Sequence, residues 1–136
     1  MLYEIATLTV KLGTAAKAVS GIDEYVRAPG AAGTLLGCWA SEIGELNQLL
    51  LLRSFDGYDA WRSERERTLR TTNPFNAGDS ITQLDFDTYA PFPFLPPVAP
   101  GKYGGVYEIR TYRLKPGGVP HTIAAWEAAM PERGKL

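Results

Sequence analysis

Carboxylates and arginines lie inside segments that otherwise read as apolar strands, and these are the residues best suited to bind a polar molecule. Glu4 lies near the start of the chain, Arg53 follows a run of four leucines, and Glu108 and Arg110 share one late segment. A carboxylate in such a place must be paired or hydrated, because burying it alone is costly. The pattern predicts either a polar small-molecule pocket or a structural ion pair, since both arrangements bring opposite charges together.

One aromatic residue joins this set. Trp39 lies in a segment that reads as a strand beside Arg53, where it could line the same pocket or belong to the core. No catalytic residue is identified, so whether the chain is an enzyme stays open. The candidate substrate-binding residues are Glu4, Trp39, Arg53, Glu108 and Arg110.

The sequence shows no pattern typical of a metal site, a Ser-His-Asp arrangement or a phosphate-binding loop. The chain has one histidine and one cysteine, too few for a recognisable metal cluster. His121 is too isolated for a Ser-His-Asp arrangement, and we interpret it as a surface residue. The glycines lack the spacing of a phosphate-binding loop. We therefore expect no metal and no cofactor.

The chain begins one structural unit twice. Residues 3–13 read YEIATLTVKLG and residues 107–117 read YEIRTYRLKPG, with six of eleven positions identical. A strand and a helix alone cannot bury their apolar faces, so each copy needs a sheet to pack against. The second copy stops soon after its first helix, which indicates a partial repeat.

Hydrophobic periodicity assigns the remaining elements. Alternating or β-branched segments predict strands, and apolar residues three and four apart predict helices. The run Leu49–Leu52 is apolar on both faces and suits a central strand. The predicted strands are 2–11, 33–41, 46–55, 80–88 and 105–114, and the predicted helices are 14–27, 56–70 and a third from Pro120 to Pro131.

The order of the first six elements is that of a ferredoxin-like β-α-β-β-α-β unit, which predicts an α+β fold with helices on one face of a four-stranded sheet. If Tyr3 and Ile5 pack beneath those helices, then Glu4, Glu108 and Arg110 point toward the other face, the interior of a barrel. That other face would need a second sheet, from a dimer or a tandem repeat, to cover it.

The domain organisation follows from a proline-rich stretch. Five prolines lie between Pro91 and Gly101 and predict a stiff, extended connector. We expect a ferredoxin-like domain at 1–90, a connector at 91–104, and an incomplete second repeat at 105–136.

The segment at 36–48, LGCWASEIGELNQ, resembles the G-x-W-x-x-E-I-G-x-L-N-Q hairpin of the NIPSNAP family. The two openings at Tyr3 and Tyr107 resemble that family's Y-E-I-R-T-Y strand, although the first has Ala6-Thr7-Leu8 in place of R-T-Y and so departs from it at residues 6 and 8. The resemblance implies a ferredoxin-like unit of the dimeric α+β barrel type, often duplicated in one chain. It fixes the fold better than the activity. Related barrels include monooxygenases and heme-handling enzymes, which is analogy from fold alone.

Composition limits the partners. A net charge of −1 gives no sign of a nucleic-acid surface, and no apolar run is long enough to span a membrane. The single cysteine suits a reducing compartment, so we expect a cytoplasmic location. Two functions stay open: a barrel that binds or transforms a small molecule, or a non-catalytic oligomerisation or protein-interaction module. Both would use a homo-oligomer formed through sheet faces.

Overall fold

The computed structural model describes residues 1–134, which form two units. The first unit comprises Met1–Pro91 and Pro97–Gly101, and the second comprises Phe92–Pro96 and the residues from Lys102 onward. The first unit contains β1 (Leu2–Val10), α1 (Ala15–Val26), β2 (Thr34–Ala40), β3 (Gln48–Phe55), α2 (Tyr58–Arg70), the short 3-10 helix η1 (Pro74–Asn76) and β4 (Ile81–Tyr89).

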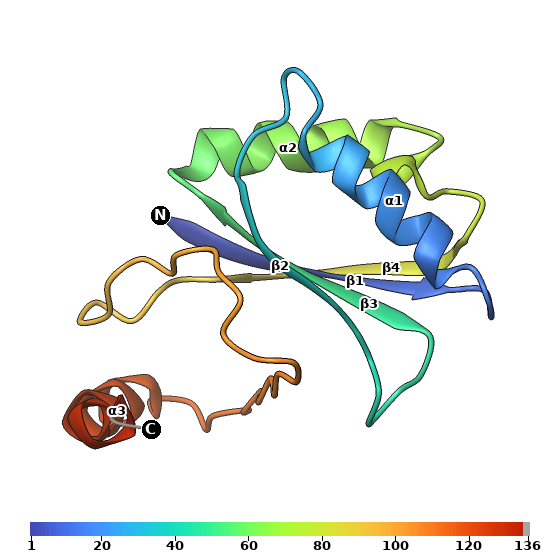
Figure 1. The fold of residues 1–136 in the computed structure, drawn as a ribbon. Coiled ribbons are helices and arrows are strands. Elements are labelled where there is room, and N and C mark those ends of the chain that lie inside the picture. Colours follow the sequence, from blue (N-terminus) through green and yellow to red (C-terminus); the bar gives the residue numbers. More distant parts are fainter. Residues whose placement is uncertain (135–136) are drawn as a thin grey trace. The chain divides into compact units, whose positions relative to one another are not determined.

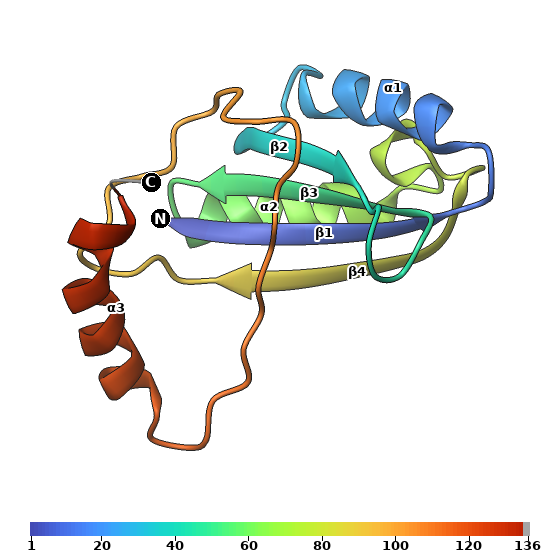
Figure 2. The same ribbon diagram turned by 60° about the horizontal axis from the view of Figure 1, so that its bottom comes forward.

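The four strands form one antiparallel sheet in the order β2-β3-β1-β4, so that β1 lies between β3 and β4 (Figure 2). This is the ferredoxin-like arrangement that the order of elements predicts. The central position of β1 means that it is paired along both edges. A copy of β1 taken alone would leave both edges without partners.

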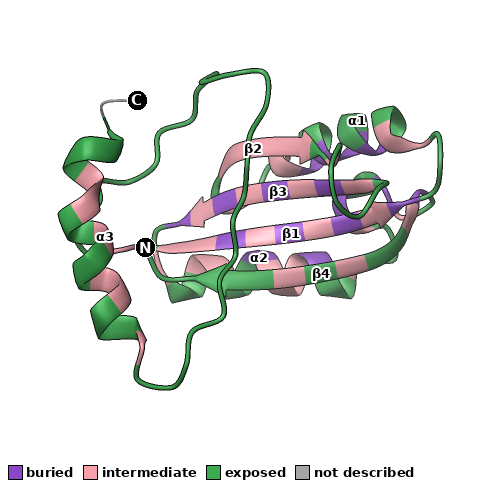
Figure 3. Ribbon diagram, turned by 90° about the horizontal axis from the view of Figure 1, so that it is seen from below, coloured by how far each residue is buried: buried purple, intermediate pink, exposed green. Residues whose placement is uncertain are grey.

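Both α1 and α2 cover the same face of the sheet (Figure 1). The core beneath them contains Ala6, Leu8 and Val10 of β1, packed with Ile22 and Tyr25 of α1. Burial alternates along β1 and β3, as Figure 3 shows by colour, because successive side chains of a strand point to opposite faces.

The predicted orientation of β1 is wrong. The row that faces the helices is that of Glu4 and Ala6, whereas Tyr3 and Ile5 lie on the opposite face. The local pattern misleads because both rows of this strand carry apolar residues. Glu4 nevertheless sits on the core side because arginines from β3 and α2 surround it.

We call the sheet face turned away from α1 and α2 the outer face. Its residues follow from the strand register, since directly opposite residues of paired strands share a face. Its members are Tyr3, Ile5, Thr7 and Thr9 of β1, Thr34, Gly37 and Trp39 of β2, Gln48, Leu50, Leu52 and Ser54 of β3, and Gln83, Asp85, Asp87 and Tyr89 of β4.

The second unit contains α3 (Val119–Arg133), which continues past Pro131 instead of ending there as predicted. Aromatic residues of the connector pack within this unit. Phe92 stacks on Phe94 with ring centroids 5.3 Å apart and lies 6.3 Å from the ring of Trp126 on α3.

The strand predicted at residues 105–114 is not present. In the described chain these residues belong to no helix or strand, and all of them are exposed. Its sequence resembles that of β1, but β1 is a strand because β3 and β4 pair with it on both sides. No described strand pairs with 105–114, so the same local pattern does not become a strand here.

Candidate functional site

Glu4 and Arg53 form a buried ion pair between neighbouring strands. Their Cα positions are partners in the β1–β3 ladder. Arg53 donates from Nη2 to Glu4 Oε1 at 2.6 Å, and the two side chains are 2% and 1% exposed. Two of the five candidate residues therefore come together, on the face that the helices cover.

Helix α2 supplies further donors to Glu4. Trp61 donates from Nε1 to Oε2 at 3.1 Å, and Arg65 donates to the same oxygen from Nε at 3.1 Å and from Nη2 at 2.5 Å. Trp61 and Arg65 are four residues apart, which places them on one side of the helix. Both oxygens of Glu4 are thus occupied, one by the sheet and one by α2.

A second carboxylate, Glu64 of α2, completes the arrangement. Arg53 donates from Nη1 to its Oε1 at 2.9 Å, and Arg67 donates to Oε1 at 2.7 Å and to Oε2 at 2.9 Å. The backbone N–H of Ala32 also donates to Oε2 at 3.1 Å, and this bond links the loop before β2 to α2. Arg53 therefore bridges two carboxylates, one from β1 and one from α2.

Aromatic rings enclose the arginines. The guanidinium carbon of Arg53 lies 5.4 Å from the ring centroid of Phe55 and 5.1 Å from that of Phe75. Arg65 lies 3.9 Å above the ring of Phe86, a geometry favourable for cation–π attraction. Within residues 1–134, Nε of Arg53 is buried without a hydrogen-bond partner.

We call this set of six residues the buried charge cluster; it consists of Glu4, Arg53, Trp61, Glu64, Arg65 and Arg67. Both carboxylates are 1% exposed and all four of their oxygens accept hydrogen bonds. No carboxylate surface remains for a substrate. The geometry suits a clamp that fixes α2 on the sheet, because a buried charge is tolerated only when it is paired and hydrogen-bonded.

Burial and neighbouring charges raise the pKa values of three groups in the first unit. Burial alone would lower the pKa of Arg67, but hydrogen bonding and attraction to Glu64 outweigh it and raise that pKa. Burial raises the pKa of the Cys38 thiol, which faces the helices from β2. The pKa of Tyr89 is raised by burial and then by the negative charge of Asp87 beside it on the outer face.

The outer face carries an apolar platform at its β2–β3 side. Trp39 is the cross-strand partner of Leu50, and Gly37 is the partner of Leu52. A methyl group built on Gly37 would lie 2.2 Å from atoms of the Trp39 ring, so this ring lies directly over Gly37. Ile5 of β1 is the partner of Leu52 and extends the platform.

Acidic residues occupy the other side of the outer face. Asp85 and Asp87 of β4 are the partners of Thr7 and Ile5, and both carboxylates are exposed. Gln83 donates from Nε2 to Asp85 Oδ2 at 2.6 Å. The sequence reasoning missed this pair. The alternation of Leu84 and Phe86 with the two aspartates could have found it, since it places both carboxylates on the face opposite the core.

The remaining candidates are not members of the buried charge cluster. Glu108 and Arg110 belong to the second unit, where Arg110 donates from Nη2 to Glu108 Oε2 at 2.8 Å and both side chains are exposed. Hydrogen bonding to Arg110 lowers the pKa of Glu108, and the same bond raises the pKa of Arg110. Trp39 lies on the outer face, and His121 is exposed on α3.

Two further observations concern metals and membranes. Among the described residues, no group of three or more His, Cys, Asp or Glu side chains is arranged to hold a metal ion. None of the helices in residues 1–134 combines the length and the apolar character needed to cross a membrane.

Comparison with protein families gives one match. The family model described as NIPSNAP matches residues 3–96, which is more than half of the chain. No curated protein matches this chain.

Solved structures of bacterial proteins match between 70% and 73% of the chain. A NIPSNAP-like domain protein from Burkholderia xenovorans is 18% identical with a TM-score of 0.57, covering 73% of this chain and 91% of that one. A NIPSNAP family protein of unknown function from Agrobacterium tumefaciens is 25% identical with a TM-score of 0.53, covering 71% and 92%. A second A. tumefaciens NIPSNAP family protein is 18% identical with a TM-score of 0.55, covering 70% and 96%.

Proposed function

This chain belongs to the NIPSNAP family, and we propose that it binds a small molecule on the outer face of its sheet, inside a barrel closed by a second layer of protein. One observation carries the proposal. The face opposite the helices presents Trp39, Leu50, Leu52 and Ile5 next to the carboxylates of Asp85 and Asp87. An apolar floor with a few polar groups at one side is typical of ligand sites.

The candidate residues then have different roles. Trp39 contacts the ligand with the face of its ring, which is held in place over Gly37. Glu4 and Arg53 do not touch the ligand; they fix β1 and β3 against α2 from the other side of the sheet. The reaction type, if there is one, stays open because the outer face shows no paired acid and base.

The organisation of the chain belongs to the same proposal. We interpret residues 1–90 as one NIPSNAP-like domain, 91–104 as a connector, and 105–136 as the start of a second repeat. The six identities between residues 3–13 and 107–117 support this interpretation. The single cysteine and absence of a spanning helix among the described residues are compatible with the cytoplasmic location we propose.

A thermal-shift screen of small aromatic and amphipathic molecules tests the ligand site. We expect hits whose stabilisation is lost in Trp39→Ala and kept in Tyr58→Ala. Tyr58 is the matched control because it is an exposed aromatic residue on α2, on the helix side of the sheet. Hits that stabilise Trp39→Ala as much as the unmodified protein would refute the assignment of the site.

The second candidate function is a non-catalytic interaction module. It is favoured by the exposed apolar side chains of the second unit, among them Val106, Ile109 and Tyr112, because contiguous exposed apolar residues often mark a protein contact. The same screen separates the two functions, since an interaction module would give no small-molecule hits.

A further inference from the structure

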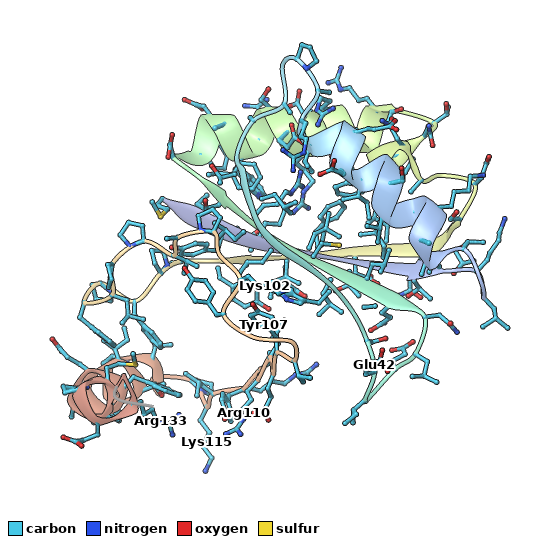
Figure 4. The ribbon with its side chains drawn as sticks, viewed as in Figure 1. Glu42, Lys102, Tyr107, Arg110, Lys115 and Arg133 are labelled. Atoms are coloured by element: carbon cyan, nitrogen blue, oxygen red, sulfur yellow. The ribbon has the colours of Figure 1, made fainter. Side chains whose placement is uncertain are left out.

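The charged groups of the outer face all have the same sign. Its two charged members are Asp85 and Asp87 of β4, and none of its residues is a lysine or arginine. The basic residues that Figure 4 labels, such as Arg110 and Lys115, belong to the second unit. The outer face therefore supplies no cation of its own to its two carboxylates.

The two aspartates also differ from the carboxylates of the buried charge cluster in their partners. Within residues 1–134 neither Asp85 nor Asp87 takes part in an ion pair. One oxygen of Asp85 accepts the hydrogen bond from Gln83, whereas no described side chain donates to the carboxylate of Asp87. The charge of Asp87 acts on its neighbour instead, since it helps to raise the pKa of Tyr89. Asp87 is thus the carboxylate that can accept a hydrogen bond from a ligand.

A straight row of residues leads across the sheet from the apolar platform to Asp87. Gly37 of β2 is the partner of Leu52 of β3. Ile5 of β1 is paired with Leu52 on one side and with Asp87 on the other. The ring of Trp39 lies over Gly37, at the far end of the row. A ligand that lies along the row contacts apolar side chains over most of its length and meets a carboxylate at its end.

The strand order sets the length of such a ligand. The row crosses the sheet from β2 to β4, which is three strand spacings, or about 14 Å. A hydrogen bond to the carboxylate occupies about 3 Å of this span, which leaves about 11 Å between a ring on Trp39 and the donor nitrogen. The ligand is therefore elongated, with its apolar part and its charge at opposite ends.

Closing the site makes a cation necessary. In the barrel of the proposed function the outer face is separated from water, so Asp85 and Asp87 lose part of their hydration. A carboxylate that leaves water without a partner is costly. An ammonium group of the ligand supplies both the opposite charge and the donors, and charge-assisted hydrogen bonds are the strong ones. A ligand that carries a carboxylate would instead bring like charges together, which is unfavourable.

We propose that the ligand of the outer face is an amphipathic amine with an aromatic ring in its apolar part. The ring lies on Trp39, the chain crosses Leu52 and Ile5, and the ammonium group donates to Asp87. Asp85, two residues away on the same face of β4, adds to the attraction. This inference rests on the proposed function, because it names the class of molecule that the same site binds.

Isothermal titration calorimetry with three molecules of one shape tests the proposal. The molecules are 6-phenylhexylamine, 6-phenylhexan-1-ol and 6-phenylhexanoic acid. They share the ring and the chain, and at neutral pH their head groups are positive, neutral and negative. We expect the amine to bind at least about tenfold more tightly than the alcohol, because it makes a charge-assisted hydrogen bond, and the acid to bind more weakly than the alcohol.

Two double variants locate the partner of the amine. Asp85→Asn/Asp87→Asn keeps the shape of both side chains, and in it the amine should bind no more tightly than the alcohol. The control Asp23→Asn/Glu24→Gln removes the same charge from exposed positions of α1 and should keep the preference for the amine. Circular dichroism confirms that each variant folds.

The outcomes distinguish this inference from the proposed function. The inference would be overturned if the acid bound as tightly as the amine, if Asp85→Asn/Asp87→Asn kept the preference for the amine, or if none of the three molecules bound. In each of these cases, screening hits that depend on Trp39 would still support the proposed function. Amine binding that is equal in Trp39→Ala and in the unmodified protein would instead refute the apolar platform, and with it the proposed function.

Discussion

Glu64 and Glu66 lie on the same helix, two residues apart, and should respond very differently to the same substitution. Glu64 is 1% exposed and accepts four hydrogen bonds, three of them from guanidinium groups. Glu66 is 44% exposed and pairs with Arg62 at 3.1 Å. Replacing either by glutamine removes one charge and keeps the shape of the side chain.

The expected cost follows from burial. In Glu64→Gln the amide nitrogen turns hydrogens toward arginine donors, and Arg53 loses one of its two carboxylates. Removing one partner of a buried ion pair costs about 3–5 kcal/mol, whereas an exposed pair contributes about 1 kcal/mol or less. For a domain of this size, 3 kcal/mol corresponds to about 12 °C or more in Tm.

Urea unfolding followed by circular dichroism measures both variants. We expect Glu64→Gln to lose about 3 kcal/mol or more in the free energy of unfolding, with an unchanged dependence on urea, and Glu66→Gln to lose about 0.5 kcal/mol or less. Equal losses in the two variants would show that the buried charge cluster does not hold α2 on the sheet.

Three further outcomes are expected. Gly21→Ala should lower the free energy of unfolding by about 1–3 kcal/mol, because its new methyl group would lie 2.3 Å from the carbonyl oxygen of Asn76. Gly57 has open space around it, so Gly57→Ala should change the free energy of unfolding by about 0.5 kcal/mol or less. Urea titrations measure both variants. Iodoacetamide should label Cys38 more slowly in the native than in the unfolded protein at pH 8, since burial raises its pKa above the ordinary 9.0 and lowers the thiolate fraction; equal rates by mass spectrometry would contradict this. For the same reason the folded state keeps the Cys38 proton to higher pH than the unfolded state, so stability should decline from about pH 9 upward, and Cys38→Ala should flatten that decline in urea titrations at pH 8, 9 and 10.

The sequence predicts the helices and strands of the first unit well, because each is short and periodic and their order is that of a ferredoxin-like unit. The four strands and two helices of 1–90 are found near the expected positions. Gly44, in the turn between β2 and β3, has a φ of +113°, a conformation that glycine adopts without steric cost. A structural ion pair is one of the two alternatives that the sequence leaves for Glu4, and the structure shows Glu4 paired with Arg53, a partner that the sequence does not identify.

The features that the sequence does not predict depend on contacts between residues far apart in the chain. Glu4 is held by Trp61 and Arg65, which are 57 and 61 positions away, so its orientation cannot be read from β1 alone. Residues 105–114 carry the same local signal as β1 but lack paired strands in the described chain. A strand is a property of the sheet as much as of its own sequence, which is why this prediction was wrong.

Hydroxyl-radical footprinting, with and without a ligand from the screen, tests most directly whether the outer face is the functional surface. We predict that the ligand protects Trp39, Leu50 and Ile5 from oxidation and leaves Tyr58 and Leu69 of α2 unchanged. Protection confined to the α2 side, with Trp39 oxidised as fast as before, would contradict the account.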